Sequence, residues 1–135
     1  MHTTRTAATA ALLFAAAVTA LPAAADDPFG PIHVAVNRHQ YTGRGCPIEI
    51  VFTGSINLRP HPRGLAFQYH WERSDGAKGP VHVVRPGPNE RTLVVREKWR
   101  VGGRGNAYDV SETLHVGSGN TRVSESSPTV HVECR

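Results

Sequence analysis

Apolar and polar residues alternate along most of the chain after residue 31, and this is the pattern of strands with one buried face. The clearest case is 65–73, where every second residue from Leu65 to Trp71 is apolar or aromatic. No segment shows the 3.6-residue period of an amphipathic helix. Strands are therefore expected at 32–39, 48–58, 65–73, 81–85, 91–101, 108–116 and 129–133.

Seven short strands in about 100 residues predict an all-β fold, a seven-stranded antiparallel sandwich of two sheets. A small closed barrel is the alternative. Trp71 is expected to be the central aromatic of the core, with Phe52, Phe67 and Trp99 around it. The polar, Ser/Gly-rich segment 117–128 is expected to be the longest connection and to be mobile.

The first 25 residues have the features of a Sec signal peptide. Arg5 precedes an apolar run at 7–20, which is shorter than the roughly 20 residues that span a bilayer. The run is followed by small residues ending at Ala25. We expect residues 1–25 to be removed, leaving a short extension at 26–31 and one domain at 32–135, with no membrane span after cleavage. An uncleaved anchor helix is the alternative.

The charge of the chain is mildly basic, at +4 overall and +3 without the predicted signal peptide. Arginine outnumbers lysine 13 to 2, a bias typical of a GC-rich bacterial genome. The arginines are spread through nearly every segment, whereas nucleic-acid-binding proteins usually concentrate them in one stripe. The sequence therefore predicts a secreted bacterial protein that binds no nucleic acid.

The two cysteines are expected to form a disulfide, because an even pair in an exported protein usually does. If the strands alternate in direction, Cys46 and Cys134 fall at the same end of the sandwich. The bond would close a loop of nearly 90 residues, for which chain entropy gives roughly 4–5 kcal/mol of stability. A catalytic or metal-binding thiol is the less favoured interpretation.

Candidate catalytic and metal-binding motifs are not apparent. Zinc sites typically show short paired spacings such as HxH or HxxxH, and neither occurs. A blue-copper site usually has an axial methionine, and Met1 is the only one. Hydrolase, P-loop and dinucleotide motifs are also missing. We therefore expect no enzyme activity, cofactor or metal, and solvent-facing positions for the seven histidines His33, His39, His61, His70, His82, His115 and His131.

A binding surface is expected on the loops opposite the cysteines, at 59–64, 86–90 and 117–128. Arginine outnumbers acidic residues there, which predicts an anionic extracellular or cell-envelope macromolecule as partner. The residues expected to contact it are Arg59, His61, Arg63, Arg85, Arg91 and Arg122.

Four stretches of the chain resemble small secreted bacterial immunoglobulin-like or fibronectin-type-III-like domains of uncharacterised function. They are CPIEIVFTGSI from Cys46, QYHWERSDGA from Gln68, WRVG from Trp99, and the cysteine at Cys134. The resemblance spans about 34–134 and implies the sandwich fold and the disulfide, without an activity. It favours a secreted binding, adhesion or envelope-associated module.

Chagasin-like cysteine-protease inhibitors are a second comparison, because they are also exported immunoglobulin-like domains. They act through three loops that correspond to those with the arginines here. Their NPTTGY-type and RPW-type motifs are missing from this chain, where Arg85-Pro86 is followed by glycine. Protease inhibition is therefore the alternative function, and a purely structural envelope protein is a third possibility.

Overall fold

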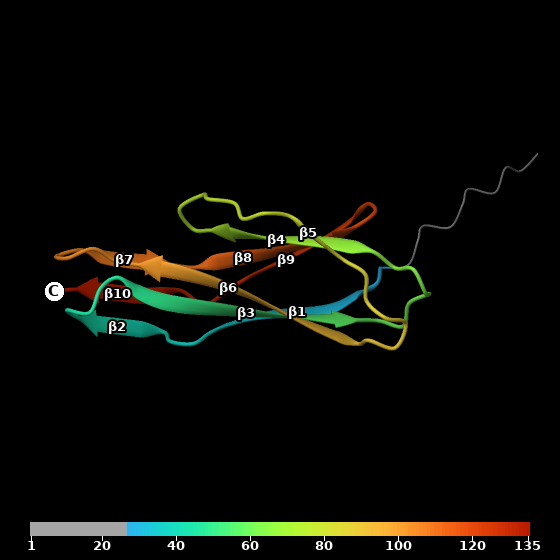
Figure 1. Cartoon of the computed structure of the whole chain (residues 1–135), viewed down its shortest axis with the longest axis horizontal. Coiled ribbons are helices and arrows are strands. Elements are labelled where there is room, and N and C mark those ends of the chain that lie inside the picture. The colour runs from blue at the N-terminus through green and yellow to red at the C-terminus, as the bar shows by residue number, and fades with distance from the viewer. Residues whose placement is uncertain (1–26) are drawn as a thin grey trace, which may run out of the picture.

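The computed structural model describes residues 27–135, so the predicted signal peptide lies outside the described residues. The described chain is all-β: its ten strands form three sheets, an arrangement consistent with a β-sandwich (Figure 1). No helix within residues 27–135 is long and apolar enough to cross a membrane. The all-β prediction is confirmed, whereas the expected seven antiparallel strands in two sheets differ from the ten strands, three sheets and one parallel pair observed in the described chain.

The first sheet contains β1 (Phe29–Val36), β3 (Ile48–Leu58) and β6 (Thr92–Val101), in the order β1-β3-β6 and all antiparallel. Alternate residues of β3 are buried along its whole length, from Ile48 to Leu58. The pattern follows from its place as the central strand, with one face on the core.

The second sheet has the order β5-β4-β8-β9 and is also antiparallel. Its strands are β4 (Phe67–Arg73), β5 (His82–Val84), β8 (Glu112–Ser118) and β9 (Thr121–Ser126). In Figure 1 this sheet lies along the upper side of the view, whereas β1 and β3 lie along the lower side.

The third sheet continues the second toward one end of the molecule. Its strands are β2 (Gln40–Gly43), β7 (Ala107–Val110) and β10 (Val130–Cys134), in the order β2-β10-β7. A single residue separates β7 from β8, and three residues separate β9 from β10. The chain segment 107–118 therefore pairs with the segment 121–134 in both the second and the third sheet. β10 pairs with β2 in parallel.

The core lies between the inner faces of these sheets. Trp71 is 3% exposed and Phe52 and Phe67 are buried, as predicted. A Cβ at Gly54 of β3 would lie 2.6 Å from Leu114 and 3.2 Å from the ring of Trp71. The missing side chain thus lets Trp71 of one sheet reach the backbone of the other.

Two of the core predictions need correction. Trp99 packs against the edge of the core but is only half-buried, and the guanidinium of Arg73 lies over its ring at 4.9 Å. Phe29 was expected in an extension at 26–31, but it is 2% exposed, starts β1 and packs edge-on against Phe67, with ring centroids 5.4 Å apart.

The predicted strand at 32–39 is wrong at both ends. β1 ends at Val36, and a second strand, β2, follows at Gln40–Gly43. This strand has only four residues, and none of them is fully buried, so it carries little hydrophobic pattern. The predicted strand at 108–116 is divided at Ser111 into β7 and β8, because the chain leaves one register there and enters another.

The segment 117–128 is not the long mobile connection that its composition predicted. β8 continues to Ser118, a tight turn follows at Gly119 and Asn120, and β9 returns beside β8. Gly119 has φ +56°, a conformation that glycine adopts without strain. Val123 of this strand packs against the core. The other residues of the strand are polar, so the sequence shows no alternation of apolar and polar residues there.

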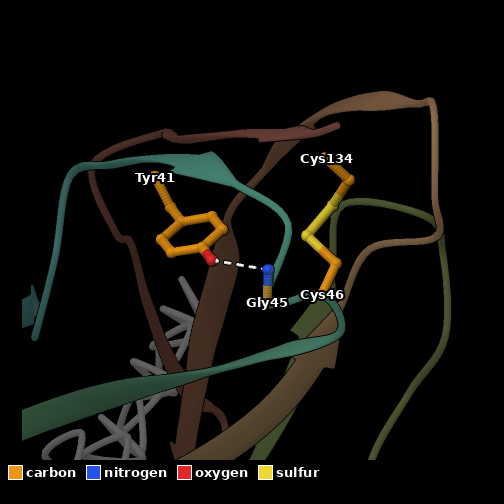
Figure 2. Close-up of a disulfide and its surroundings, with 4 residues drawn as sticks. All are labelled: Tyr41, Gly45, Cys46 and Cys134. Atoms are coloured by element: carbon orange, nitrogen blue, oxygen red, sulfur yellow. Dashed lines mark hydrogen bonds between the residues drawn. A yellow bond between two sulfur atoms is a disulfide. The ribbon is translucent and has the colours of Figure 1, made fainter.

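The disulfide closes one end of the molecule. Cys46 precedes β3 and bonds to Cys134 of β10, with Cα atoms 5.9 Å apart (Figure 2). Nearby, the hydroxyl of Tyr41 accepts a 3.0 Å hydrogen bond from the backbone nitrogen of Gly45. The predicted pairing is confirmed. We call this region the disulfide end.

Candidate functional site

The connections at 59–66 and 85–91 and the turn at 118–121 lie together at the end opposite the disulfide, and we call this the loop end (Figure 1). Two contacts support the grouping. The ring of His61 reaches the carbonyl of Gly87 at 2.8 Å, and Oγ of Ser118 donates to the carbonyl of Ala66 at 3.1 Å.

His61 joins two of these loops. Its Nδ1 lies 2.9 Å from the carbonyl oxygen of Arg59, and its Nε2 lies 2.8 Å from that of Gly87. A carbonyl oxygen only accepts hydrogen bonds, and only the protonated imidazolium donates from both ring nitrogens. An N–H at Nε2 donates to the carbonyl of Gly87, so the His61 side chain links the two loops.

Arginines predominate on these two loops. Arg59, Arg63, Arg85 and Arg91 are all exposed, and Glu90 is the one acidic residue within 59–66 and 85–91. The structure thus places five of the six predicted binding residues, including His61, on two adjacent loops.

Some of these guanidinium groups already have partners in the protein. Arg59 lies near Asp27, with Nη1 3.4 Å from its carbonyl and 4.0 Å from its carboxylate. Arg91 donates to the carbonyls of Pro88 and Glu90, both at 3.0 Å. These bonds hold the loops in place and leave part of each guanidinium exposed. For Arg63 and Arg85 the structure gives no hydrogen bond or ion pair within the described residues.

Arg122 is not on a loop, contrary to its predicted place. It lies on β9, and its Nη1 donates to the carbonyls of Gly119 at 2.8 Å and Thr121 at 3.0 Å. The side chain lines a shallow pocket of about 280 Å³ beside Ala66 and Val83. It therefore lies next to the loop end but chiefly fixes the β8–β9 turn.

A second basic surface lies at the disulfide end. Arg44, Arg104 and Arg135 line one open cleft of about 420 Å³ beside Cys46. The guanidinium of Arg135 is 3.5 Å from the carboxylate of Glu133, which offsets part of that charge. Any test of the loop end must therefore compare the two ends.

A cluster of two histidines and a carboxylate lies on the outer face of the β5-β4-β8-β9 sheet. His70 on β4 faces His115 on β8, and Nε2 of His115 lies 3.3 Å from Oε2 of Glu72. The HxH and HxxxH spacings do not reveal this cluster, because its residues come together only through strand pairing. The signal present was that His70 and Glu72 share the polar phase of the clearest predicted strand.

A buried carboxylate, Glu112, lies beside the core with a side chain that is 0% exposed. Its Oε1 is 3.3 Å from Nε of Arg73, whose Nη2 is 3.5 Å from Glu97. Burial is the main cause that raises the pKa of Glu112 to about 7; the carboxylate of Glu97 adds to it and Arg73 opposes it. Ionisation of this buried carboxyl group near pH 7 therefore opposes folding.

Comparison with known proteins gives no family assignment: neither a protein-family model nor a curated protein matches this sequence.

Proposed function

We propose that the protein is an exported, non-enzymatic binding module with an immunoglobulin-like sandwich fold, and that its loop end binds an anionic extracellular or cell-envelope macromolecule. The single observation that carries the binding role is the pair of arginine-bearing loops that His61 joins.

The strand pairing supports the immunoglobulin-like assignment. One layer of the sandwich is the first sheet, with β1, β3 and β6. The other layer is formed by the second and third sheets together, and at its centre β7 and β8 pair with β10 and β9 as one long hairpin. β1 and β2 belong to one N-terminal segment that pairs first with β3 and then with β10. Strands that change sheets in this way form the corners of β-sandwiches.

Export is supported by two independent features. The first 25 residues have the pattern of a cleaved signal peptide. The protein also has a disulfide between Cys46 and Cys134, and such bonds persist in oxidising compartments such as the periplasm and the extracellular space.

The anionic partner follows from charge and preorganisation. The two loops carry four exposed arginines and one glutamate, so their net charge is positive. Pro60, Pro62, Pro86 and Pro88 stiffen the same segments. A stiff loop loses less conformational entropy when it binds. Guanidinium groups form paired, charge-assisted hydrogen bonds with carboxylates, sulfates and phosphates.

The test compares two variants that remove equal charge from opposite ends. Arg63→Ala with Arg85→Ala changes the loop end at two residues that make no hydrogen bond or ion pair within residues 27–135, and Arg44→Ala with Arg104→Ala changes the disulfide end. Binding to an immobilised sulfated polysaccharide and to poly-glutamate is measured for both. We expect the loop-end variant to bind at least about tenfold more weakly and the other to bind like the parent.

Equal losses in the two variants would show diffuse attraction by net charge and contradict the proposed site. A loss confined to the disulfide-end variant would move the site to the cleft at Arg44 and Arg104. No binding of the parent protein to either polyanion would contradict the anionic partner itself. Inhibition of a cysteine protease at a 1:1 ratio would instead favour the alternative function.

A further inference from the structure

Three side chains that commonly bind metals gather on the outer face of the second sheet. His70 and Glu72 are two residues apart on β4 and so point to the same face. His115 is the register partner of His70 on β8. One ligand atom from each of the three lies within 4.8 Å of the others.

A third strand orients one of these ligands. Oγ of Ser124, the register partner of His115 on β9, lies 2.7 Å from Nδ1 of that imidazole. The other nitrogen, Nε2, faces Glu72. Metal-binding histidines in proteins usually have this arrangement, in which a hydrogen bond at one ring nitrogen fixes the ring and leaves the other to the ion.

The ligand atoms are close enough to share one ion once the side chains rotate. Ligand atoms that share a tetrahedral zinc ion at about 2.1 Å are roughly 3.4 Å apart. The rings of His70 and His115 are stacked with centroids 4.8 Å apart. Because the nitrogen lone pairs lie in the ring planes, rotation about the side-chain bonds must break this stacking to bring one nitrogen of each ring and the carboxylate to a common point.

The site is accessible and only partly shielded from water. The side chains of His115 and Glu72 are 33% and 35% exposed. A pocket of about 220 Å³ opens beside the two histidines and is also lined by Gln68 and Arg122. A hydrated ion can thus reach the ligands from solvent.

Some charged groups around the cluster favour the binding of a cation and others oppose it. Burial, the facing His115 and Lys78 lower the pKa of His70, and Glu72 opposes them. Lys78 repels a cation, and the carboxylate of Glu72 offsets that repulsion. The guanidinium of Arg122 is held at the carbonyls of Gly119 and Thr121.

We propose that His70, His115 and Glu72 form a binding site for one divalent transition-metal ion of the zinc and copper class, with water at the remaining positions. Imidazole nitrogens favour these ions, whereas magnesium and calcium favour sites made of oxygen ligands. The site lies on strands rather than on the arginine loops, so it does not depend on the proposed function.

The experiment is a zinc titration of the untagged protein with its disulfide formed, because an added histidine tag would itself bind zinc. Calorimetry and equilibrium dialysis should give one zinc per chain, and magnesium and calcium at the same concentrations should not bind. His70→Gln and His115→Gln should each weaken zinc binding at least about tenfold, and Ser124→Ala should do so by about tenfold.

His131→Gln is the matched control, because His131 also lies beside a carboxylate, Asp109 at 2.6 Å, but without a second histidine in the cluster. It should leave zinc affinity unchanged. Copper(II) added well below one equivalent should broaden the ring signals of His70 and His115 in the NMR spectrum before those of other histidines. No saturable zinc binding, an equal loss in His131→Gln, or unchanged affinity in His70→Gln with a native circular dichroism spectrum would overturn the proposal.

Discussion

Gly102 packs directly against the sulfur of Cys134. A Cβ at residue 102 would lie 2.5 Å from that Sγ and 3.1 Å from the Sγ of Cys46, and the residue has φ +113°. The turn after β6 therefore accommodates the disulfide only because this residue has no side chain. The WRVG motif in the sequence ends on this glycine.

Gly102→Ala should lower the free energy of unfolding by about 2–5 kcal/mol, since it adds backbone strain and overlap with the disulfide. Urea denaturation of the oxidised protein measures the loss. Gly103→Ala is the control, because its nearest neighbour would be the hydroxyl of Tyr108 at 3.2 Å and its φ is not positive. Equal stability of the two variants would contradict the close packing at residue 102.

The disulfide should contribute up to about 4–5 kcal/mol, because it links residues 88 positions apart and so restricts the unfolded chain. Cys46→Ser with Cys134→Ser should show this loss in urea denaturation. Intact-mass measurement of the exported protein should give a chain that begins at Asp26 and gains about two daltons on reduction, one per thiol. Free thiols, or an uncleaved N-terminus, would contradict this prediction.

Trp71→Ala should destabilise the protein by about 3–5 kcal/mol, because it removes a buried aromatic side chain that packs against Gly54 across the two sheets. Trp99→Ala should cost much less, since that ring is half-exposed and its contact with Arg73 is a surface cation–π interaction. The melting temperatures of the two variants test the difference. Similar values would show that the two tryptophans are buried alike.

Stability should decrease as the pH rises from about 4.5 to about 7, because of Glu112. Its pKa is about 7 in the folded protein against an ordinary 4.5, so the folded state binds the proton more tightly than the unfolded state does. The protonated carboxyl group thus contributes about 3 kcal/mol to the free energy of unfolding. This contribution is fully present below the lower pKa and is lost above the higher one.

Urea denaturation between pH 5 and pH 8 measures this effect. Glu112→Gln, which stays neutral at every pH, should have a flatter profile than the parent. The exposed Glu125 offers a control, and Glu125→Gln should retain the parent profile. If Glu112→Gln kept the full pH dependence, another group would have to be responsible.

Strong alternation made most of the fold predictable. Residues 48–58 were predicted with their observed bounds, and the burial of Trp71 and the Cys46–Cys134 bond followed from phase and strand direction. The prediction failed where strands are short or mostly exposed. β2 has no fully buried residue, and Val123 is the only apolar residue of β9, so neither strand shows a clear alternation.

The candidate sites were less predictable, for a related reason. The two loops at 59–66 and 85–91 could be assigned to one end from strand direction, but the bonds of His61 that join them are tertiary contacts. His70 and His115 are far apart in the sequence and meet only through the register of β4 and β8. Cross-strand neighbours of this kind leave no fixed spacing in a sequence.

The salt dependence of polyanion binding tests the proposed role of the loop end most directly. Dissociation constants for an immobilised sulfated polysaccharide are measured at several salt concentrations for the parent, for Arg63→Ala with Arg85→Ala, and for Arg44→Ala with Arg104→Ala. We expect the parent to weaken steeply as salt rises, and we expect the loop-end variant alone to bind weakly with a shallower dependence. The same slope and the same affinity in both double variants would contradict a specific site at the loop end.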